Sequence, residues 1–274
     1  MANPQYNHGD VILRFNDACF SYSEKRAILN KVNFSLRERA KITLMGQNGA
    51  GKSTIFNLIL GQLKLDEGAI NIKNGTTIGI ASQSIRKQDL QKTVTEFFET
   101  SFPQKIYDIE PKIKKILKVV NLSALLTKKI NTFSGGEQAR LLLALALIQN
   151  PDILLLDEPT NNLDKTGIEH LTKFLIEYPK TVLVISHDAH FLNSFTQGVL
   201  YLDIYQQKVE QYVGDYLKVV AEIMARIERE RRENVRLQKD ITARKEQMNF
   251  FAQKGGHMRD VARKMREAIE ELEG

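Results

Sequence analysis

Cysteine is nearly absent from this chain of 274 residues, which has Cys19 alone. A single cysteine excludes an internal disulfide framework and indicates a reducing compartment. Long apolar runs are also absent: the longest, residues 141–148, has eight residues, whereas about 20 are needed to span a bilayer. The first ten residues lack the basic start and apolar stretch of a secretory signal. We therefore expect a soluble, cytoplasmic protein with no membrane insertion.

Positive charge is in modest excess and is concentrated in one segment. The chain has 39 Lys and Arg against 33 Asp and Glu, a formal net charge of +6. Residues 226–266 carry 13 Lys and Arg against 6 Asp and Glu, a net +7, so the remaining 233 residues sum to −1. The basic character of the protein therefore belongs to its C-terminal part, where a polyanionic partner is the natural expectation.

Glycine and proline are missing from residues 215–253, where apolar residues recur at helical spacing. We predict one long helix there, about 58 Å at 1.5 Å per residue. Residues 254–256, Lys-Gly-Gly, would break it, and a second helix would begin near His257. Residues 214–274 are therefore predicted as a basic helical hairpin linker. Its second helix is too short to cover the first, so we expect the hairpin to be truncated.

The segment 1–213 alternates short apolar runs with helical stretches. The alternating patterns at 11–22 and 31–38 predict half-buried, antiparallel strands. Apolar runs bounded by polar residues predict strands buried on both faces, as in a parallel sheet; they are 41–45, 76–82, 152–157 and 181–186. Helices are predicted over 52–61, 94–101, 110–120, 136–149 and 166–177. The prediction is an α/β domain with a mixed sheet.

A glycine-rich motif follows the predicted strand 41–45 and matches the phosphate-binding pattern G-x-x-x-x-G-K-[ST]. Its residues are Gly46, Gln47, Asn48, Gly49, Ala50, Gly51, Lys52, Ser53 and Thr54. The glycines let backbone N–H groups surround phosphates, and the helix that follows directs its N-terminal dipole toward them. Lys52 would reach the β- and γ-phosphates, and the Ser53 hydroxyl would bind Mg²⁺.

Further polar residues lie at the ends of predicted strands and helices. Asp157 and Glu158 end an apolar strand; Asp157 suits a Mg²⁺ shell and Glu158 suits activation of water, although an ordinary helix N-cap fits the same position. Residues 134–137, Ser-Gly-Gly-Glu, open a helix and suit an anion, although a capping serine alone would explain them. His187 and Gln83 each follow a strand, and either one alone is more typical of a structural role.

The order of these residues resembles the ATP-binding cassette (ABC) ATPase family. Residues 46–54 resemble Walker A, Gln83 the Q-loop glutamine, 154–158 Walker B and His187 the switch histidine. Residues 133–138, Phe-Ser-Gly-Gly-Glu-Gln, resemble the family's signature, and Asn162-Leu163-Asp164 resembles its D-loop. Tyr22 resembles the aromatic residue that stacks on adenine, although Phe20 is close enough to take the same role. The resemblance implies a P-loop NTPase fold with a mixed sheet core, an antiparallel β subdomain and an α-helical signature subdomain.

The resemblance also implies a mechanism. ATP is bound by residues 46–54 and Tyr22, and Mg²⁺ by Ser53, Gln83 and Asp157. Catalytic roles fall to Glu158, His187, Lys52 and Gln83. Family members sandwich ATP between two cassettes, so Ser134, Gly135, Gly136 and Glu137 would face ATP held by a second cassette. That cassette is either a second copy of this chain or one encoded beyond its end.

Three kinds of ABC protein compete. Residues 157–164, DEPTNNLD, and residues 212–216, YVGDY, resemble the ABC-F subfamily, whose inter-cassette linker reaches toward tRNA and rRNA near the peptidyl-transferase region of the ribosome. The alternative is the nucleotide-binding subunit of a membrane transporter, for which a charged helical hairpin is unusual. A DNA-repair type ATPase fits less well, because its coiled coil interrupts the cassette. The ABC-F resemblance assigns RNA contacts to Lys254, His257, Arg259, Arg263 and Arg266.

Overall fold

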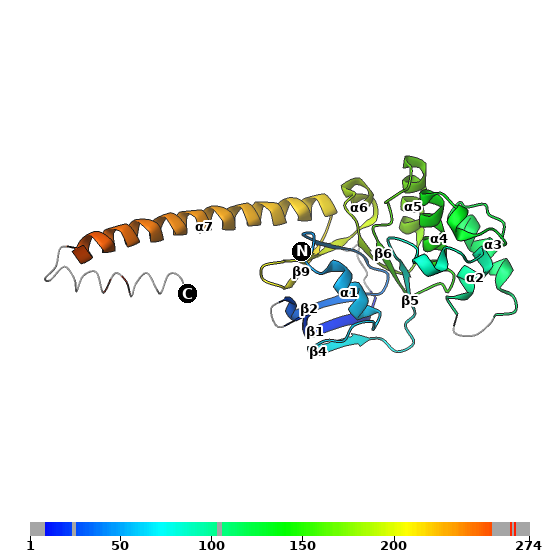
Figure 1. Ribbon diagram of the computed structural model, residues 1–274, viewed down its shortest axis with the longest axis horizontal. Helices are drawn as coiled ribbons and strands as arrows, with labels where there is room; N and C mark the ends of the chain where they lie inside the picture. Colours follow the sequence, from blue (N-terminus) through cyan, green and yellow to red (C-terminus); the bar gives the residue numbers. More distant parts are fainter. Residues whose placement is uncertain (1–8, 24–25, 103–105, 254–263, 265, 267–274) are drawn as a thin grey trace. The chain divides into compact units, whose positions relative to one another are not determined.

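The computed structural model describes residues 9–23, 26–102, 106–253, 264 and 266 (Figure 1). The chain divides into two compact units, Met1–Val219 and Val220–Gly274. The first unit holds two β-sheets and a set of helices, and the described part of the second unit includes the continuation of one long helix.

The smaller sheet is antiparallel and is formed largely by the N-terminal part of the chain. It contains β1 (Val11–Ser21), β2 (Ala27–Arg37) and β4 (Glu67–Ile72) in the order β2-β1-β4. Apolar side chains of β1 and β2 alternate toward the core, and the rings of Phe15 and Phe34 stack with centroids 4.4 Å apart. The prediction of antiparallel strands at the N-terminus is confirmed.

The larger sheet has six strands in the order β5-β6-β7-β3-β8-β9. Its strands are β3 (Lys41–Gly46), β5 (Ile78–Ala81), β6 (Ile153–Asp157), β7 (Thr181–Ile185), β8 (Gly198–Leu202) and β9 (Val209–Val213). The pairings are parallel apart from β8 with β9, so the sheet is mixed as predicted. Strands β6 and β7 bury nearly every residue because they lie inside the sheet and are covered on both faces.

Helices complete the first unit. They are α1 (Lys52–Ile59), α2 (Val94–Glu99), α3 (Ile109–Val119), α4 (Gly135–Leu147), α5 (Lys165–Glu177) and α6 (Ala189–Phe195). Helices α2, α3 and α4 gather beside the β5 end of the sheet and form the predicted helical subdomain (Figure 1). Elements β4, β8, β9 and α6 are absent from the sequence-based prediction.

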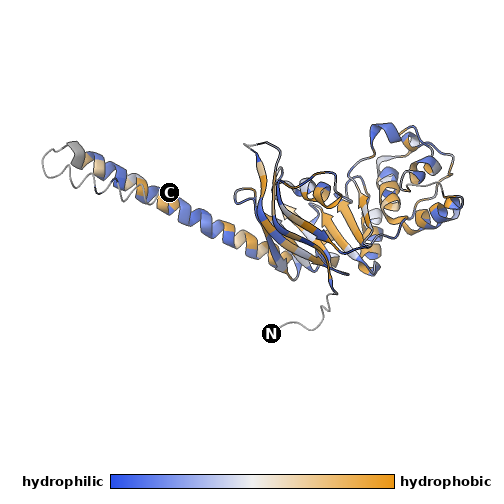
Figure 2. Cartoon of the chain, turned by 90° about the horizontal axis from the view of Figure 1, so that it is seen from below, coloured by the Kyte–Doolittle hydropathy of each residue, from blue (hydrophilic) through white to orange (hydrophobic). Residues whose placement is uncertain are grey.

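The predicted long helix is confirmed as α7 (Tyr216–Gln253), which has 38 residues. At 1.5 Å per residue it is about 57 Å long. Figure 2 shows α7 coloured largely as hydrophilic, with shorter hydrophobic stretches between, and residues 228–240 are all exposed. The break at 254–256 and the assigned RNA contacts Lys254, His257, Arg259 and Arg263 lie outside the described residues, whereas Arg266 is described and exposed.

Helices long and apolar enough to cross a membrane are not found among the described residues.

Candidate nucleotide-binding site

The glycine-rich loop joins the end of β3 at Gly46 to the start of α1 at Lys52. Gly49 and Gly51 adopt left-handed backbone conformations, with φ of +82° and +108°. A Cβ atom on Gly51 would lie 2.2 Å from Cγ2 of Ile28, so glycine is required there for both its backbone and its lack of a side chain. The first turn of α1 has no acidic residue, which leaves its N-terminal dipole available to an anion.

The Lys52 side chain lies over this loop. Its ammonium donates to the carbonyl oxygens of Gly46, at 2.8 Å, and of Gln47, at 3.1 Å. Burial lowers the pKa of Lys52, while the carboxylates of Glu158 and Asp157 raise it. A cation that is half-buried and close to two carboxylates fits the neutralisation of phosphate oxygens.

Asp157 and Glu158 lie where β6 leaves the sheet, next to the end of β7. Burial raises the pKa of both carboxyl groups; the Lys52 ammonium opposes this for Asp157, and His187 opposes it for Glu158. Two partly buried carboxylates beside one ammonium leave a local excess of negative charge. A divalent cation would relieve that excess.

Glu158 and His187 contact each other directly. The His187 backbone N–H donates to Glu158 Oε2 at 3.3 Å, and His187 Nε2 lies 3.3 Å from Glu158 Oε1. Glu158 has a φ of +51°, and its N–H donates to the Ile185 carbonyl at 2.8 Å. Glu158 therefore has an unusual backbone conformation that is held by a hydrogen bond to β7, and its carboxylate lies against the histidine.

These residues share one open pocket of about 650 Å³, within the size range of ligand sites. The predicted residues that line it are Tyr22, Asn48, Gly49, Gly51, Lys52, Ser53, Thr54, Gln83, Asp157, Glu158 and His187. Gly46, Gln47 and Ala50 belong to the same loop but do not line it. The described lining also includes Arg26, Ile28, Asn161 and Ile185, which the sequence analysis does not identify. Arg26 is close because the β1–β2 hairpin places it over the Tyr22 ring, 5.7 Å from its centroid.

Tyr22 fits an adenine-stacking role better than Phe20 does. Tyr22 is 51% exposed and lines the pocket, and its hydroxyl lies 3.1 Å from Thr54 Oγ1. Phe20 is only 6% exposed and packs edge-on against Tyr22. An aromatic ring must offer a free face to stack on a base, and of these two rings Tyr22 is the more exposed.

Replacing Tyr22 by alanine is expected to weaken nucleotide binding about tenfold, because stacking of a base on an aromatic ring contributes about 1–3 kcal/mol. Titration with a fluorescent ATP analogue would measure the change. Tyr22→Phe keeps the ring and is the control, so equal losses in both variants would assign the effect to the hydroxyl rather than to stacking.

The predicted signature residues lie outside this pocket, at the start of α4. Ser134 is the N-cap of α4, and its backbone N–H and hydroxyl donate to Glu137 Oε2 at 2.8 and 2.9 Å. These hydrogen bonds from Ser134 lower the pKa of Glu137. The pattern is a capping box, so the helix start carries its own anion. Gly135 and Gly136 form the first turn.

Asp164, the predicted D-loop residue, also lies outside the pocket. It is the N-cap of α5 and accepts from the Gly167 N–H at 3.0 Å. The Arg140 guanidinium lies 3.3 Å from the same carboxylate oxygen. The structure therefore does not bring Asp164 and residues 134–137 together with the Walker A loop of this chain.

The donor set at the pocket fits Mg²⁺. Ser53, Gln83 and Asp157 supply oxygen atoms, the ligands that Mg²⁺ prefers. Groups of three or more His, Cys, Asp or Glu residues suited to a metal are not found among the described residues. Mg²⁺ usually binds through one or two carboxylates together with substrate phosphates, so these residues match a metal that arrives with a nucleotide.

The glycine-rich cradle, its lysine and the paired carboxylates define a P-loop nucleotide-binding site on an α/β domain. A family model described as ABC transporter matches residues 29–161. A nucleotide-free ATP-binding cassette from an ABC transporter aligns with a TM-score of 0.68 at 22% identity, covering 78% of this chain and 96% of that one. The chain therefore has the fold of an ABC-type ATP-binding cassette, as its sequence pattern predicts.

Two curated proteins illustrate the sequence similarity. YdiF of Bacillus subtilis is 35% identical over 209 residues, covering 76% of this chain and 32% of YdiF. YheS of Escherichia coli (strain K12) is 36% identical over 206 residues, covering 74% of this chain and 31% of YheS. The chain thus spans about a third of the length of these two relatives.

Proposed function

We propose that this protein is an ABC-F type factor that hydrolyses ATP to ADP and phosphate between two cassettes and binds ribosomal RNA and tRNA through its C-terminal helix. The observation that carries the proposal is α7, a long basic helix that follows an uninterrupted cassette. The second cassette would be a further part of the natural protein or another copy of the chain. The relatives are about three times as long as the part they share with this chain, which leaves room for a second cassette.

The charges on α7 suit a polyanion. Helix α7 carries nine Lys and Arg against six Asp and Glu. Arg229, Arg232, Arg236 and Lys239 follow one another at intervals of three or four residues, so they form a basic stripe along one face of the helix. All four are exposed. Each contact with a nucleic acid phosphate releases counterions, which makes such binding favourable and salt-dependent.

The start of α7 is hydrogen-bonded to α6 of the cassette. Only two residues, Gly214 and Asp215, separate β9 from α7, and Gly214 has a φ of +137° at this turn. The Leu217 N–H donates to Asn193 Oδ1 of α6 at 3.2 Å. Helix α6 begins directly after Asp188, the neighbour of His187. A displacement of His187 would therefore reach the start of α7 through α6.

The transporter-subunit alternative predicts a different role for α7. The likeness to transporter cassettes concerns the fold, which transporters and soluble factors share. A transporter subunit would have no need for a basic stripe that binds RNA. Ribosome binding is therefore the property that separates the two functions.

Reversing two charges of the stripe, Arg229→Glu with Arg236→Glu, is expected to weaken binding to purified ribosomes about tenfold in the presence of ATP. It should also lower the slope of log K against log salt by about 1.5, because two phosphate contacts are lost. Cosedimentation of the full-length protein with ribosomes at several salt concentrations would measure both quantities.

The matched control is Lys64→Glu with Lys208→Glu, which changes the net charge equally at exposed positions of the cassette. Equal losses in the two double variants would show that general charge rather than the stripe is responsible. A wild-type protein that fails to bind ribosomes with ATP would contradict the proposed function.

A further inference from the structure

Arg140 connects three segments of the helical subdomain. It lies on α4, four residues after Gly136, and its side chain is 24% exposed. Its Nη1 donates to the Asn121 carbonyl at 3.0 Å, just after α3, and its Nη2 donates to Asp164 Oδ1 at 3.3 Å, at the start of α5. One guanidinium therefore ties the signature helix both to the end of α3 and to the loop that follows the catalytic strand β6.

The first turn of α4 contacts the same loop independently. A Cβ atom on Gly136 would lie 2.8 Å from the Asn162 carbonyl oxygen, and one on Gly135 would lie 3.5 Å from the Asn162 side chain. Gly167 leaves room for the ion pair, because a Cβ there would lie 3.2 Å from Arg140 Nη2. Residues 162–164 are thus held against α4 at two places about one helical turn apart.

The same loop leads back to the nucleotide pocket. The Asn161 N–H donates to the Glu158 carbonyl at 3.2 Å, and the Leu163 N–H donates to the Thr160 carbonyl at 3.2 Å. These successive turns leave little freedom between Glu158 and Asp164. Asn161 lines the nucleotide pocket itself.

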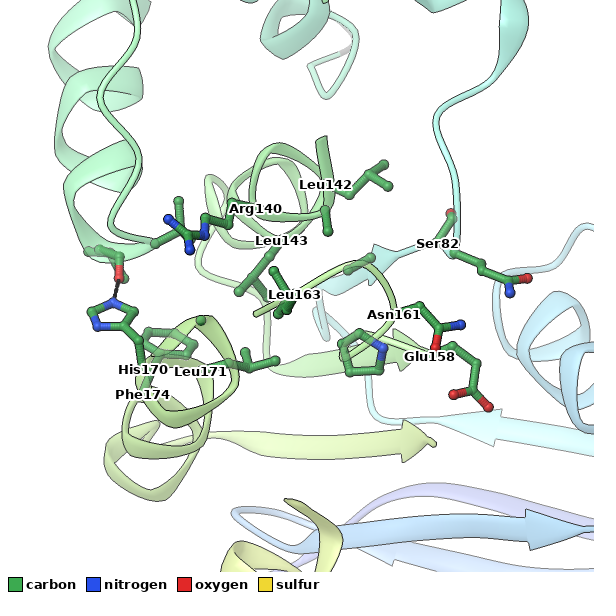
Figure 3. A pocket seen from close by; sticks show the side chains of 17 residues that line it. Ser82, Arg140, Leu142, Leu143, Glu158, Asn161, Leu163, His170, Leu171 and Phe174 are labelled. Atoms are coloured by element: carbon green, nitrogen blue, oxygen red, sulfur yellow. Dashed lines mark hydrogen bonds between the residues drawn. The ribbon is translucent and has the colours of Figure 1, made fainter. Parts of the chain in front are cut away.

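The space between α4, α5 and this loop is almost filled. Figure 3 shows it, with Arg140, Leu163 and His170 from different elements around it and Glu158 at one side. The cavity has a volume of about 30 Å³, equivalent to one water molecule. A closely packed region of this kind transmits a displacement rather than absorbing it.

We propose that Arg140 is a positioning residue for ATP hydrolysis: it fixes the signature helix to the loop 158–164, so that the catalytic carboxylate and the signature face move together. This inference rests on the proposed two-cassette mechanism, in which Ser134 and Gly136 face ATP held by the other cassette. Arg140 lines neither the nucleotide pocket nor the exposed start of α4, so it acts through the residues it holds. Arginine suits the task because its planar fork reaches two acceptors in different directions, which lysine does not.

The test is the ATPase kinetics of the full-length protein with Arg140→Ala, Arg140→Lys and Asp164→Asn. Asparagine at 164 keeps an N-cap acceptor for α5 and removes only the charge that pairs with Arg140. We expect kcat to fall about tenfold in Arg140→Ala and Asp164→Asn, because small misplacements of reacting groups are costly. KM for ATP should change less than twofold, since the pocket lining is intact. Arg140→Lys should recover only part of the loss.

The double variant Arg140→Ala with Asp164→Asn separates coupling from two independent losses. Residues that act as one unit give a double variant no slower than the single variants. A hundredfold loss in the double variant would overturn the proposal, and so would an unchanged kcat in Arg140→Ala.

His170→Gln is the control for general loss of packing. His170 lines the same cavity and its Nε2 donates to the Val119 carbonyl at 2.8 Å, a contact between α5 and α3 that does not involve the signature helix. Its kcat should match wild type even if its melting temperature falls. An equal kcat loss in His170→Gln would assign the effect to packing. The two-cassette mechanism is tested separately on the wild-type protein. If the ATPase activity per molecule of wild-type protein is the same whether or not two cassettes are assembled, the two-cassette mechanism is wrong.

Discussion

Glu158→Gln is expected to lower ATP turnover about a hundredfold to ten-thousandfold while ATP binding is retained, because a positioned general base contributes about that factor. Glutamine has nearly the same shape but cannot accept a proton from the attacking water. Burial raises the pKa of Glu158, so its carboxylate form is disfavoured by the fold. The neutral variant should therefore be at least as stable as wild type at neutral pH. Phosphate release and equilibrium binding of ATP would measure the two effects.

Glu169→Gln provides the matched control, because Glu169 is exposed on α5 and does not line the nucleotide pocket. It should keep wild-type turnover. In the full-length protein, we also expect Glu158→Gln to prolong the ATP-bound state on ribosomes. Unchanged turnover in Glu158→Gln would remove Glu158 from the catalytic assignment, although the ATP-binding role of the loop would stand.

Gly51→Ala is expected to reduce ATP affinity more than tenfold and to destabilise the fold by about 2–4 kcal/mol. This destabilisation is the sum of two costs, that of a left-handed backbone for alanine and that of overpacking. The second cost follows from the 2.2 Å approach of the added Cβ to Ile28 Cγ2. Relief of this clash would move the loop, whose N–H groups must surround the phosphates. Thermal unfolding and ATP titration would measure both losses.

Gly61→Ala separates the two causes. Gly61 has a φ of +69°, also left-handed, but a Cβ there would meet no atom within 4 Å. It should cost stability through its backbone alone and leave ATP affinity unchanged. Wild-type ATP affinity in Gly51→Ala would mean that the loop tolerates displacement and that its geometry is not the source of binding.

The parts of the fold that sequence predicts best are those with a strong local pattern. Strands β6 and β7 are continuous apolar runs, and α7 is a long segment without glycine or proline. Strand β4 has no such pattern: it begins with Glu67 and Gly68, and most of its residues are exposed because it is the edge strand beside β1. Its strand conformation comes from pairing with β1, which no local pattern encodes. Strand β8, in contrast, is a five-residue apolar run, so its sequence pattern is sufficient to predict a buried strand.

The candidate site divides in the same way. Glycine spacing identifies the loop 46–54, and paired carboxylates after a strand identify Asp157 and Glu158. Arg26 reaches the pocket only because the β1–β2 hairpin places it over Tyr22. Asn161 reaches it through the turn that follows Glu158. Neither Arg26 nor Asn161 belongs to a recognisable motif, so their part in the pocket can be seen only from their positions in space.

The capping box at the start of α4 has a consequence for how two cassettes would meet. The Glu137 carboxylate already accepts hydrogen bonds from the backbone N–H and hydroxyl of Ser134. A triphosphate that binds at Ser134 would therefore have to displace the Glu137 carboxylate, because that carboxylate already occupies the donors of Ser134. Such an exchange releases the internal carboxylate as it takes up the phosphate, so its net free energy is smaller than the count of new hydrogen bonds suggests. Assembly of the sandwich would then be readily reversed once the phosphate has been cleaved and has left.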